Sequence, residues 1–126
     1  MLAVLERDGE LGILRVDNPP VNALSPELVA AIDTAFAEFE ADASLRGLVI
    51  EAAGRTFVAG GDIKSFDAPD FSAVRFNALL GRIEACERPV GAALFGTALG
   101  GGLEFAMACH IRIANPATKL GLPEIK

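Results

Sequence analysis

The residues that could do chemistry begin with Gly100 to Gly102, three consecutive glycines that follow the apolar run Pro89 to Phe95. The run is typical of a buried strand, and the segment after the glycines is typical of an apolar helix with one carboxylate, Glu104. Glycines at a strand-to-helix junction let backbone approach a ligand and leave N–H groups free where the helix dipole favours negative charge. A lone glutamate among apolar neighbours is a poor choice for a purely structural position. The pattern therefore predicts an oxyanion-binding turn with a general acid or base beside it.

A dinucleotide-binding turn is the competing interpretation, because glycine-rich strand-to-helix turns also hold pyrophosphates. Two details disfavour it. The fingerprint needs a small residue where Phe105 stands, and its later acidic residue would be Glu124, which follows Pro123 rather than ending an apolar strand. A glycine pattern alone is a weak signal, so this interpretation stays as an alternative that NAD binding would reveal.

Length and composition limit the class of protein. The chain has 126 residues, 52% of them apolar and 22% charged, which is typical of a single globular domain. Its net charge of −6, without a basic stripe, argues against nucleic acid as the main partner. No apolar run has the length of a membrane span, and the N-terminus lacks a signal-peptide layout. We therefore expect a soluble, cytoplasmic protein.

Cysteine and histidine offer little material for a metal site or a histidine-based triad. Cys86 and Cys109 are 23 positions apart without a Cys-x-x-Cys motif, so we expect two reduced core thiols. His110 is the only histidine, and a structural role is favoured for it. No metal site is predicted, and carboxylates must carry any acid–base chemistry.

Strand-like and helix-like segments alternate along the chain, which predicts an α/β fold. Ser25 as N-cap and Pro26 at the first helical position predict a helix to about Ala41. Gly54 to Ile63 is a second glycine-rich stretch after a strand, so both turns are expected to serve one site at the carboxyl ends of the strands. Further strands are predicted at 2–7, 11–17, 48–50, 89–95 and 111–114, and a further helix in the later part of 63–88.

Four motifs, in order along the chain, resemble the enoyl-CoA hydratase/isomerase (crotonase) superfamily. They are Asn18-Pro19-Pro20-Val21-Asn22-Ala23-Leu24-Ser25, Phe57-Val58-Ala59-Gly60-Gly61-Asp62-Ile63-Lys64, Gly96-Thr97-Ala98-Leu99-Gly100-Gly101-Gly102-Leu103-Glu104 and Leu120-Gly121-Leu122-Pro123-Glu124. The first motif, with Cys109-His110, is most similar to the hydratase part of multifunctional fatty-acid β-oxidation enzymes, where a 3-hydroxyacyl-CoA dehydrogenase follows. The resemblance implies a crotonase-like spiral of repeated ββα units and an acyl-CoA thioester substrate. It implies no separate cofactor, since coenzyme A is part of the substrate.

The resemblance also implies roles for individual residues. The backbone N–H groups of Gly61 and Gly101 match the two donors that hold the thioester oxygen. Glu104 and Glu124 match two glutamates that handle water and protons. Gly61 stands where the family often has alanine, which leaves the backbone donor intact, and His110 replaces a frequent aspartate. The positions implied to bind the substrate are Ala59, Gly61, Asp62, Ile63, Lys64 and Gly101.

The activity implied is reversible hydration of trans-2-enoyl-CoA to 3-hydroxyacyl-CoA in fatty-acid β-oxidation. A Δ3-Δ2-enoyl-CoA isomerase is the alternative. The presence of both glutamates favours hydration, because isomerases of the family can work with one. The family domain continues well past Glu124, so residues 1–126 are expected to be the N-terminal part of one such domain. A truncated acyl-CoA-binding or oligomerising fragment without activity is therefore a further alternative. The partners implied are copies of the chain in a trimer-based homo-oligomer, or the rest of a longer multifunctional chain.

Overall fold

The computed structural model describes residues 2–54, 56–58, 72–99 and 101–121. Strands and helices alternate along this part of the chain, which confirms the predicted α/β class. The elements in chain order are β1 (Ala3–Asp8), β2 (Leu11–Val16), α1 (Pro26–Ala41), β3 (Gly47–Ala52), α3 (Ser72–Ala85), β4 (Val90–Leu94), β5 (Thr97–Leu99), α4 (Gly101–Ala108), β6 (Ile111–Ala114) and β7 (Lys119–Gly121).

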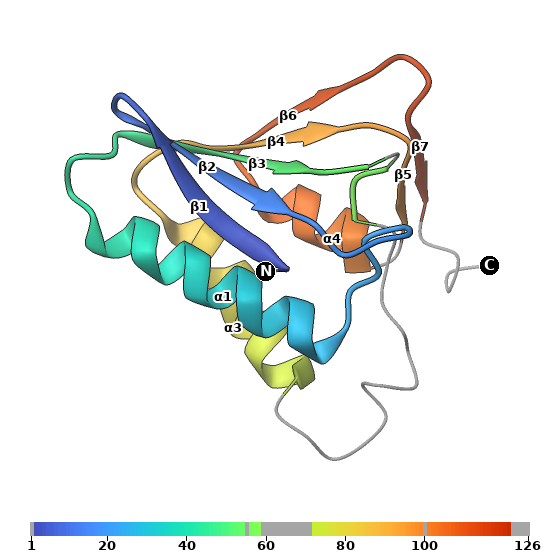
Figure 1. Cartoon of the computed structure of the whole chain (residues 1–126), viewed down its shortest axis with the longest axis horizontal. Coiled ribbons are helices and arrows are strands. Elements are labelled where there is room, and N and C mark those ends of the chain that lie inside the picture. Colours follow the sequence, from blue (N-terminus) through green and yellow to red (C-terminus); the bar gives the residue numbers. More distant parts are fainter. Residues whose placement is uncertain (1, 55, 59–71, 100, 122–126) are drawn as a thin grey trace.

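The larger sheet has five strands in the order β1-β2-β3-β4-β6. β1 and β2 form an antiparallel hairpin, and β2, β3, β4 and β6 run parallel to one another. The parallel strands therefore end at one common edge. Figure 1 shows the described helices α1, α3 and α4 on one face of this sheet, and the small β5–β7 sheet at the end where β4 and β6 finish.

Helix α1 begins where the sequence predicts and ends at the predicted residue. The Ser25 hydroxyl oxygen accepts the Leu28 N–H at 3.1 Å, and Pro26 occupies the first turn, where its missing N–H costs nothing. The buried side chains of α1 recur at helical spacing and form the face turned to the sheet. They are Leu28, Val29, Ile32, Ala35, Phe36 and Phe39.

The core lies between the sheet and these helices. Every second residue of β2, β3 and β4 is buried toward the helices, as expected when helices cover one face. Phe36 and Phe39 of α1 are fully buried with ring centroids 5.9 Å apart. Outside the core, the Asp33 carboxylate on α1 binds the guanidinium groups of Arg75 and Arg82 on α3, which joins the two helices.

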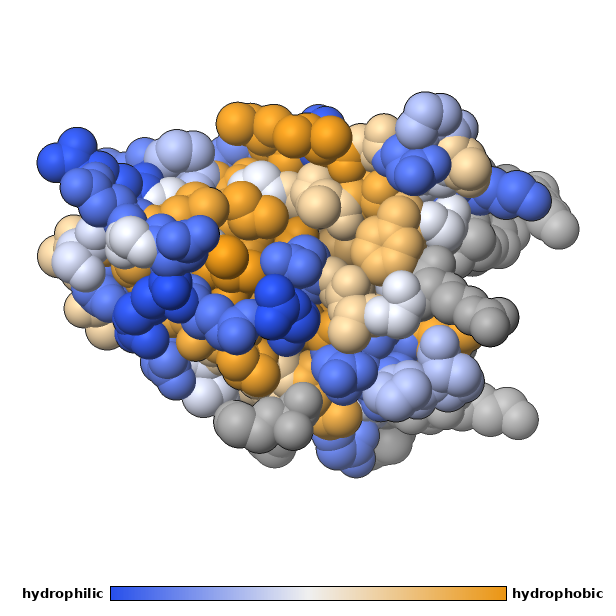
Figure 2. All heavy atoms as spheres, turned by 45° about the horizontal axis from the view of Figure 1, so that its top comes forward, coloured by the Kyte–Doolittle hydropathy of each residue, from blue (hydrophilic) through white to orange (hydrophobic). Residues whose placement is uncertain are grey.

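The opposite face of the sheet carries apolar side chains at its β6 side. Ile111 and Ile113 are 53% and 72% exposed and lie on the same side of β6, two residues apart. Figure 2, which brings this face forward, shows apolar side chains gathered across it among polar neighbours. None of the helices in the described part of the chain is long and apolar enough to cross a membrane.

Two short strands differ from the sequence prediction. The prediction placed the glycine turn directly after the strand 89–95, but β5 comes between β4 and the helix, after a turn at Gly96 with a positive φ of 67°. β7 was not predicted either, since Leu120 and Gly121 were noted only as part of a motif. Each strand has only three residues and exists because it pairs with the other, so neither has a periodicity of its own to detect.

Candidate active site at the carboxyl end of the sheet

The loops that leave the parallel strands are joined into one surface at the common edge. The Phe57 N–H, in the loop after β3, donates to the Phe95 carbonyl after β4 at 2.9 Å. The Lys119 N–H at the start of β7 donates to the Gly96 carbonyl at 2.8 Å. The loops after β3 and β4 and the start of β7 therefore lie side by side. Ligands of open α/β sheets bind outside such an edge.

The small sheet brings two segments of the chain together at this edge. β5 and β7 are parallel, and Leu99 lies opposite Gly121. β5 leads within two residues to Gly101, the first residue of α4. β7 ends three residues before Glu124 in the sequence. β5, which precedes Glu104 in the chain, is thus hydrogen-bonded to β7, which precedes Glu124 in the chain.

Helix α4 presents its one carboxylate to solvent at its first turn. Gly101 is half-buried, and Glu104 is exposed, whereas Phe105 and Ala106 on the other side of the helix are fully buried. The helix is therefore anchored by its apolar residues while the carboxylate stays accessible. The N–H groups of its first turn have no partner within the helix, and the dipole makes this end favourable for negative charge.

An aromatic pair fixes α4 against the loop after β3. The rings of Phe57 and Phe105 are stacked, with centroids 5.9 Å apart and planes inclined by 16°. Both side chains are fully buried. Phe57 thus contacts the residue after β4 through its backbone N–H. Its ring contacts Phe105, which follows Glu104 in α4.

Asn22 also binds the loop after β3, through its side chain. Its side chain is 2% exposed, and its amide nitrogen donates to the carbonyls of Ala53 and Thr56 at 2.8 and 2.9 Å. Its amide oxygen accepts the Asn18 N–H at 2.7 Å. This asparagine belongs to the first of the four motifs, which indicated no role for it. The signal that could have found it is a pair of asparagines four residues apart around Pro19-Pro20, in a loop that must be held by side chains.

The described residues include only part of the predicted site. Gly101 and Glu104 lie in one turn of α4, with the free N–H end and the exposed carboxylate on the same short helix. The remaining predicted positions lie outside the described residues, so their roles stay predictions. They are Ala59, Gly61, Asp62, Ile63, Lys64 and Glu124.

His110 and the cysteines belong to the framework. The Val90 N–H donates to Nδ1 of His110 at 3.1 Å, and Nε2 lies 3.2 Å from the Glu84 carbonyl, so the ring joins the end of α3 to the start of β4. Both cysteines are free, and burial raises the pKa of the Cys109 thiol to about 12. Within the part of the chain that the structure describes, no three His, Cys, Asp or Glu side chains are grouped to hold a metal ion.

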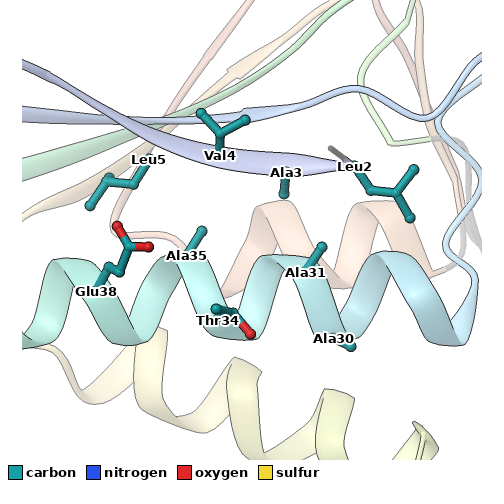
Figure 3. Close-up of a pocket in the computed structure, with 9 residues that line it drawn as sticks. All are labelled: Leu2, Ala3, Val4, Leu5, Ala30, Ala31, Thr34, Ala35 and Glu38. Atoms are coloured by element: carbon teal, nitrogen blue, oxygen red, sulfur yellow. The ribbon is translucent and has the colours of Figure 1, made fainter.

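A groove of about 570 Å³ runs between β1 and α1. Figure 3 shows its lining, with Glu38 near one end. Of the side chains that line it, Thr34 and Glu38 carry polar atoms, and Glu38 lies 4.0 Å from the Arg7 guanidinium. Such a lining offers no set of donors for a developing negative charge. The groove is therefore not the candidate active site, which lies at the first turn of α4. The lining residues are Leu2, Ala3, Val4, Leu5, Ala30, Ala31, Thr34, Ala35 and Glu38.

The family model described as "Enoyl-CoA hydratase/isomerase" matches residues 6–126. The chain therefore belongs to the enoyl-CoA hydratase/isomerase family, as its motifs indicated. It is 44% identical over 124 residues to a probable enoyl-CoA hydratase of Bacillus subtilis, covering 94% of this chain and 48% of that protein. It is 40% identical over 115 residues to the human peroxisomal bifunctional enzyme, covering 91% of this chain and 16% of that protein.

Solved structures agree on the fold. The enoyl-CoA hydratase of Thermoplasma volcanium superposes with a TM-score of 0.88 at 33% identity, covering 99% of this chain and 52% of that chain. An enoyl-CoA hydratase subunit of Geobacillus kaustophilus gives 0.86 at 34% identity, covering 99% and 50%. The predicted crotonase-like fold is thereby confirmed. The chain spans about half the length of the hydratases it matches, as expected from the sequence.

Proposed function

We propose that the chain acts on acyl-CoA thioesters as an enoyl-CoA hydratase, adding water reversibly to trans-2-enoyl-CoA to give 3-hydroxyacyl-CoA in fatty-acid β-oxidation. The observation that carries this proposal is the placement of Glu104 in the first turn of α4, beside the free N–H groups that begin at Gly101. Membership of the family and the likeness to hydratases support the choice of substrate and reaction.

The thioester carbonyl is the group that this helix end would stabilise. When the oxygen of water bonds to the β carbon, the electrons of the double bond move toward the carbonyl and leave negative charge on its oxygen. The N–H of Gly101, at the positive end of α4, is one proposed donor to that oxygen, and the N–H of Gly61 is the other. Donors fixed in place before the reaction are worth about 10²–10³ in rate each.

The two glutamates would complete the proton balance. One carboxylate takes a proton from the attacking water, and the other delivers a proton to the α carbon as the enolate collapses. We assign these steps to Glu104 and Glu124 as a pair. The pairing of β5 with β7 supports the assignment, since it brings the strand before Glu104 alongside the strand before Glu124.

The reaction sets the other requirements. Hydration transfers no electrons between molecules, so the proposal needs no redox cofactor, and coenzyme A enters as part of the substrate. We place the chain in the cytoplasm, either in a trimer-based homo-oligomer or within a longer multifunctional chain. Exposed Ile111 and Ile113 support contact with further protein, because exposed apolar patches are typical of interfaces. The likeness to bifunctional enzymes supports the second arrangement.

The test is hydration of trans-2-butenoyl-CoA, followed as loss of the absorbance of the conjugated thioester. Glu104→Gln keeps the shape of the side chain but cannot accept a proton, so we expect kcat to fall by about 10²–10⁴. Glu87→Gln is the matched control, because it removes the same charge from an exposed position at the other end of the sheet and should leave kcat unchanged. Full activity in Glu104→Gln would overturn the assignment, and migration of the double bond without hydration would favour the isomerase.

A further inference from the structure

The side chain of Asn22 is buried, and its backbone lies in a conformation that non-glycine residues rarely adopt. Its φ is +54°, which usually favours glycine, and its side chain is 2% exposed. An asparagine tolerates this conformation better than most residues, yet glycine would adopt it at lower cost. The side chain must therefore contribute something that glycine cannot.

What it contributes is three hydrogen bonds, two to the loop after β3 and one within its own loop. Both N–H groups of the amide are used, one by the Ala53 carbonyl at 2.8 Å and one by the Thr56 carbonyl at 2.9 Å. The amide oxygen accepts the Asn18 N–H at 2.7 Å. Buried carbonyls just beyond the end of a strand have no partner in the sheet, and leaving them unpaired costs free energy. The neutral Asn22 side chain satisfies two such carbonyls, those of Ala53 and Thr56.

The clamped loop continues directly into the aromatic contact with α4. Thr56 is followed by Phe57, whose N–H donates to the Phe95 carbonyl at 2.9 Å and whose ring stacks on Phe105. Phe105 is the neighbour of Glu104 on α4. An unbroken series of contacts thus runs from the Asn22 amide, through Thr56 and Phe57, to the helix that carries the carboxylate.

We propose that Asn22 is a positioning residue for the thioester site: it sets the place of α4, and with it the Gly101 donor and the Glu104 carboxylate, through Phe57 and Phe105. This inference rests on the proposed function. The residue does not touch the reacting atoms. Its effect is to keep a preorganised donor and base at a fixed distance from the substrate, where a misplacement of about 1 Å costs roughly 10²-fold in rate.

Two substitutions separate the hydrogen bonds from the backbone conformation. Asn22→Gly keeps the positive φ and removes all three side-chain bonds. Asn22→Asp keeps the shape and the bond from Asn18, but it places an oxygen against two carbonyl oxygens. Val29→Ala is the control for lost stability, because it truncates a fully buried side chain of α1 that takes no part in the series of contacts.

Turnover and the bound spectrum are the readouts that a merely structural role would not change. We expect both Asn22 variants to hydrate trans-2-butenoyl-CoA with a kcat lowered about 10–100-fold and a KM changed little, because the loss falls on the transition state. The red shift that hydrogen-bond donors cause in a bound conjugated enoyl-CoA should shrink in step. Val29→Ala should unfold more easily but keep the wild-type kcat and the wild-type red shift. Asn22 variants that lose stability only, with wild-type kcat and red shift, would overturn the proposal.

Hydrogen exchange makes the test independent of turnover. In Asn22→Gly the Phe57 N–H should exchange at least about tenfold faster than in Val29→Ala at matched stability. The loop after β3 opens more often once it has lost its hydrogen bonds to Asn22. Equal exchange rates overturn the clamp. A wild-type chain that neither shifts the chromophore nor hydrates it overturns the proposed function, and the exchange result then still decides whether Asn22 holds Phe57. Asn22→Asp serves in this measurement if the glycine variant does not fold.

Discussion

The two ends of the parallel strands are held by different kinds of side chain. At the amino end, the guanidinium of Arg88 donates to the carbonyls of Asp42, Leu45 and Glu40 at 3.0, 2.9 and 3.2 Å and lies 4.0 Å above the Phe39 ring. At the carboxyl end, the neutral amide of Asn22 holds Ala53 and Thr56. One end is tied by a permanent cation, the other by an uncharged group.

This difference fits the chemistry proposed for each end. A cation fixed beside the site would favour the ionised form of the carboxylates that must handle protons and would make them weaker bases. At the amino end the same cation is useful, because the carbonyls at the C-terminus of α1 carry partial negative charge. Among the described residues, the loop after β3 is thus held by an uncharged side chain at the strand ends where Glu104 is exposed.

The largest expected effect is at the carboxyl end. Phe105→Ala removes a fully buried ring and its stacking partner contact, so the free energy of unfolding should fall by about 3–5 kcal/mol in a urea titration. Met107→Ala on the same helix is the control, since that side chain is 59% exposed and should change stability by about 0.5 kcal/mol or less. Similar losses in the two variants would contradict the anchoring of α4 through Phe105.

The next effect separates stability from function at the amino end. Arg88→Ala leaves three carbonyls without their charged donor, and we expect unfolding to become easier by about 2–3 kcal/mol with kcat unchanged. Arg46→Ala removes the same charge from a side chain that is 82% exposed and pairs with Glu10, so it should cost about 0.5 kcal/mol or less. A large fall in kcat in Arg88→Ala would break the comparison between the two ends.

A smaller effect is expected on the stability of the fold at low pH. The Ser44 hydroxyl and N–H and the Arg7 guanidinium hydrogen-bond the Asp42 carboxylate and lower its pKa to about 2. A lowered folded-state pKa means that the stabilisation is present above the usual pKa of 3.8 and is lost as pH falls toward 2. Asp42→Asn should therefore flatten the acid side of the stability curve below about pH 4, measured by thermal unfolding. An Asp42 carboxyl that titrates near its usual pKa in NMR would contradict this.

The smallest effect is on thiol reactivity. Burial raises the pKa of the Cys109 thiol to about 12, and its sulfur lies 3.6 Å from the Phe105 carbonyl. Near neutral pH we therefore expect iodoacetamide to label the half-buried Cys86 first and Cys109 only on unfolding. Peptide mass spectrometry distinguishes the two sites, and rapid labelling of Cys109 in the native chain would show that α4 opens easily.

Local signals predicted most of the framework. Ser25 and Pro26 fixed the start of α1, and its apolar spacing gave the buried face from Leu28 to Phe39. Sequence reasoning missed β5 and β7 because strands of three residues arise from pairing with each other rather than from a local pattern. It also missed the roles of Asn22 and Arg88, whose carbonyl partners lie more than thirty positions away in the chain.

The sequence indicated some residues of the candidate site and not others. A lone glutamate in an apolar segment after glycines indicated Glu104, and the structure places it exposed in the first turn of α4, close to Gly101 in the chain. Phe57 was quoted only as a letter of a motif. Its stacking on Phe105 depends on how the loop after β3 meets a helix about fifty positions later, which spacing alone does not reveal.

We propose that acyl-CoA chemistry occurs at the first turn of α4, at the carboxyl end of the sheet. Hydrogen exchange with and without butyryl-CoA, which has no double bond to hydrate, tests it most directly. We predict slower exchange of the Gly102 and Leu103 amides on ligand binding and unchanged exchange of Leu45 and Leu48 at the amino end. Slowing confined to the groove between β1 and α1, or to the amino end, would contradict the account.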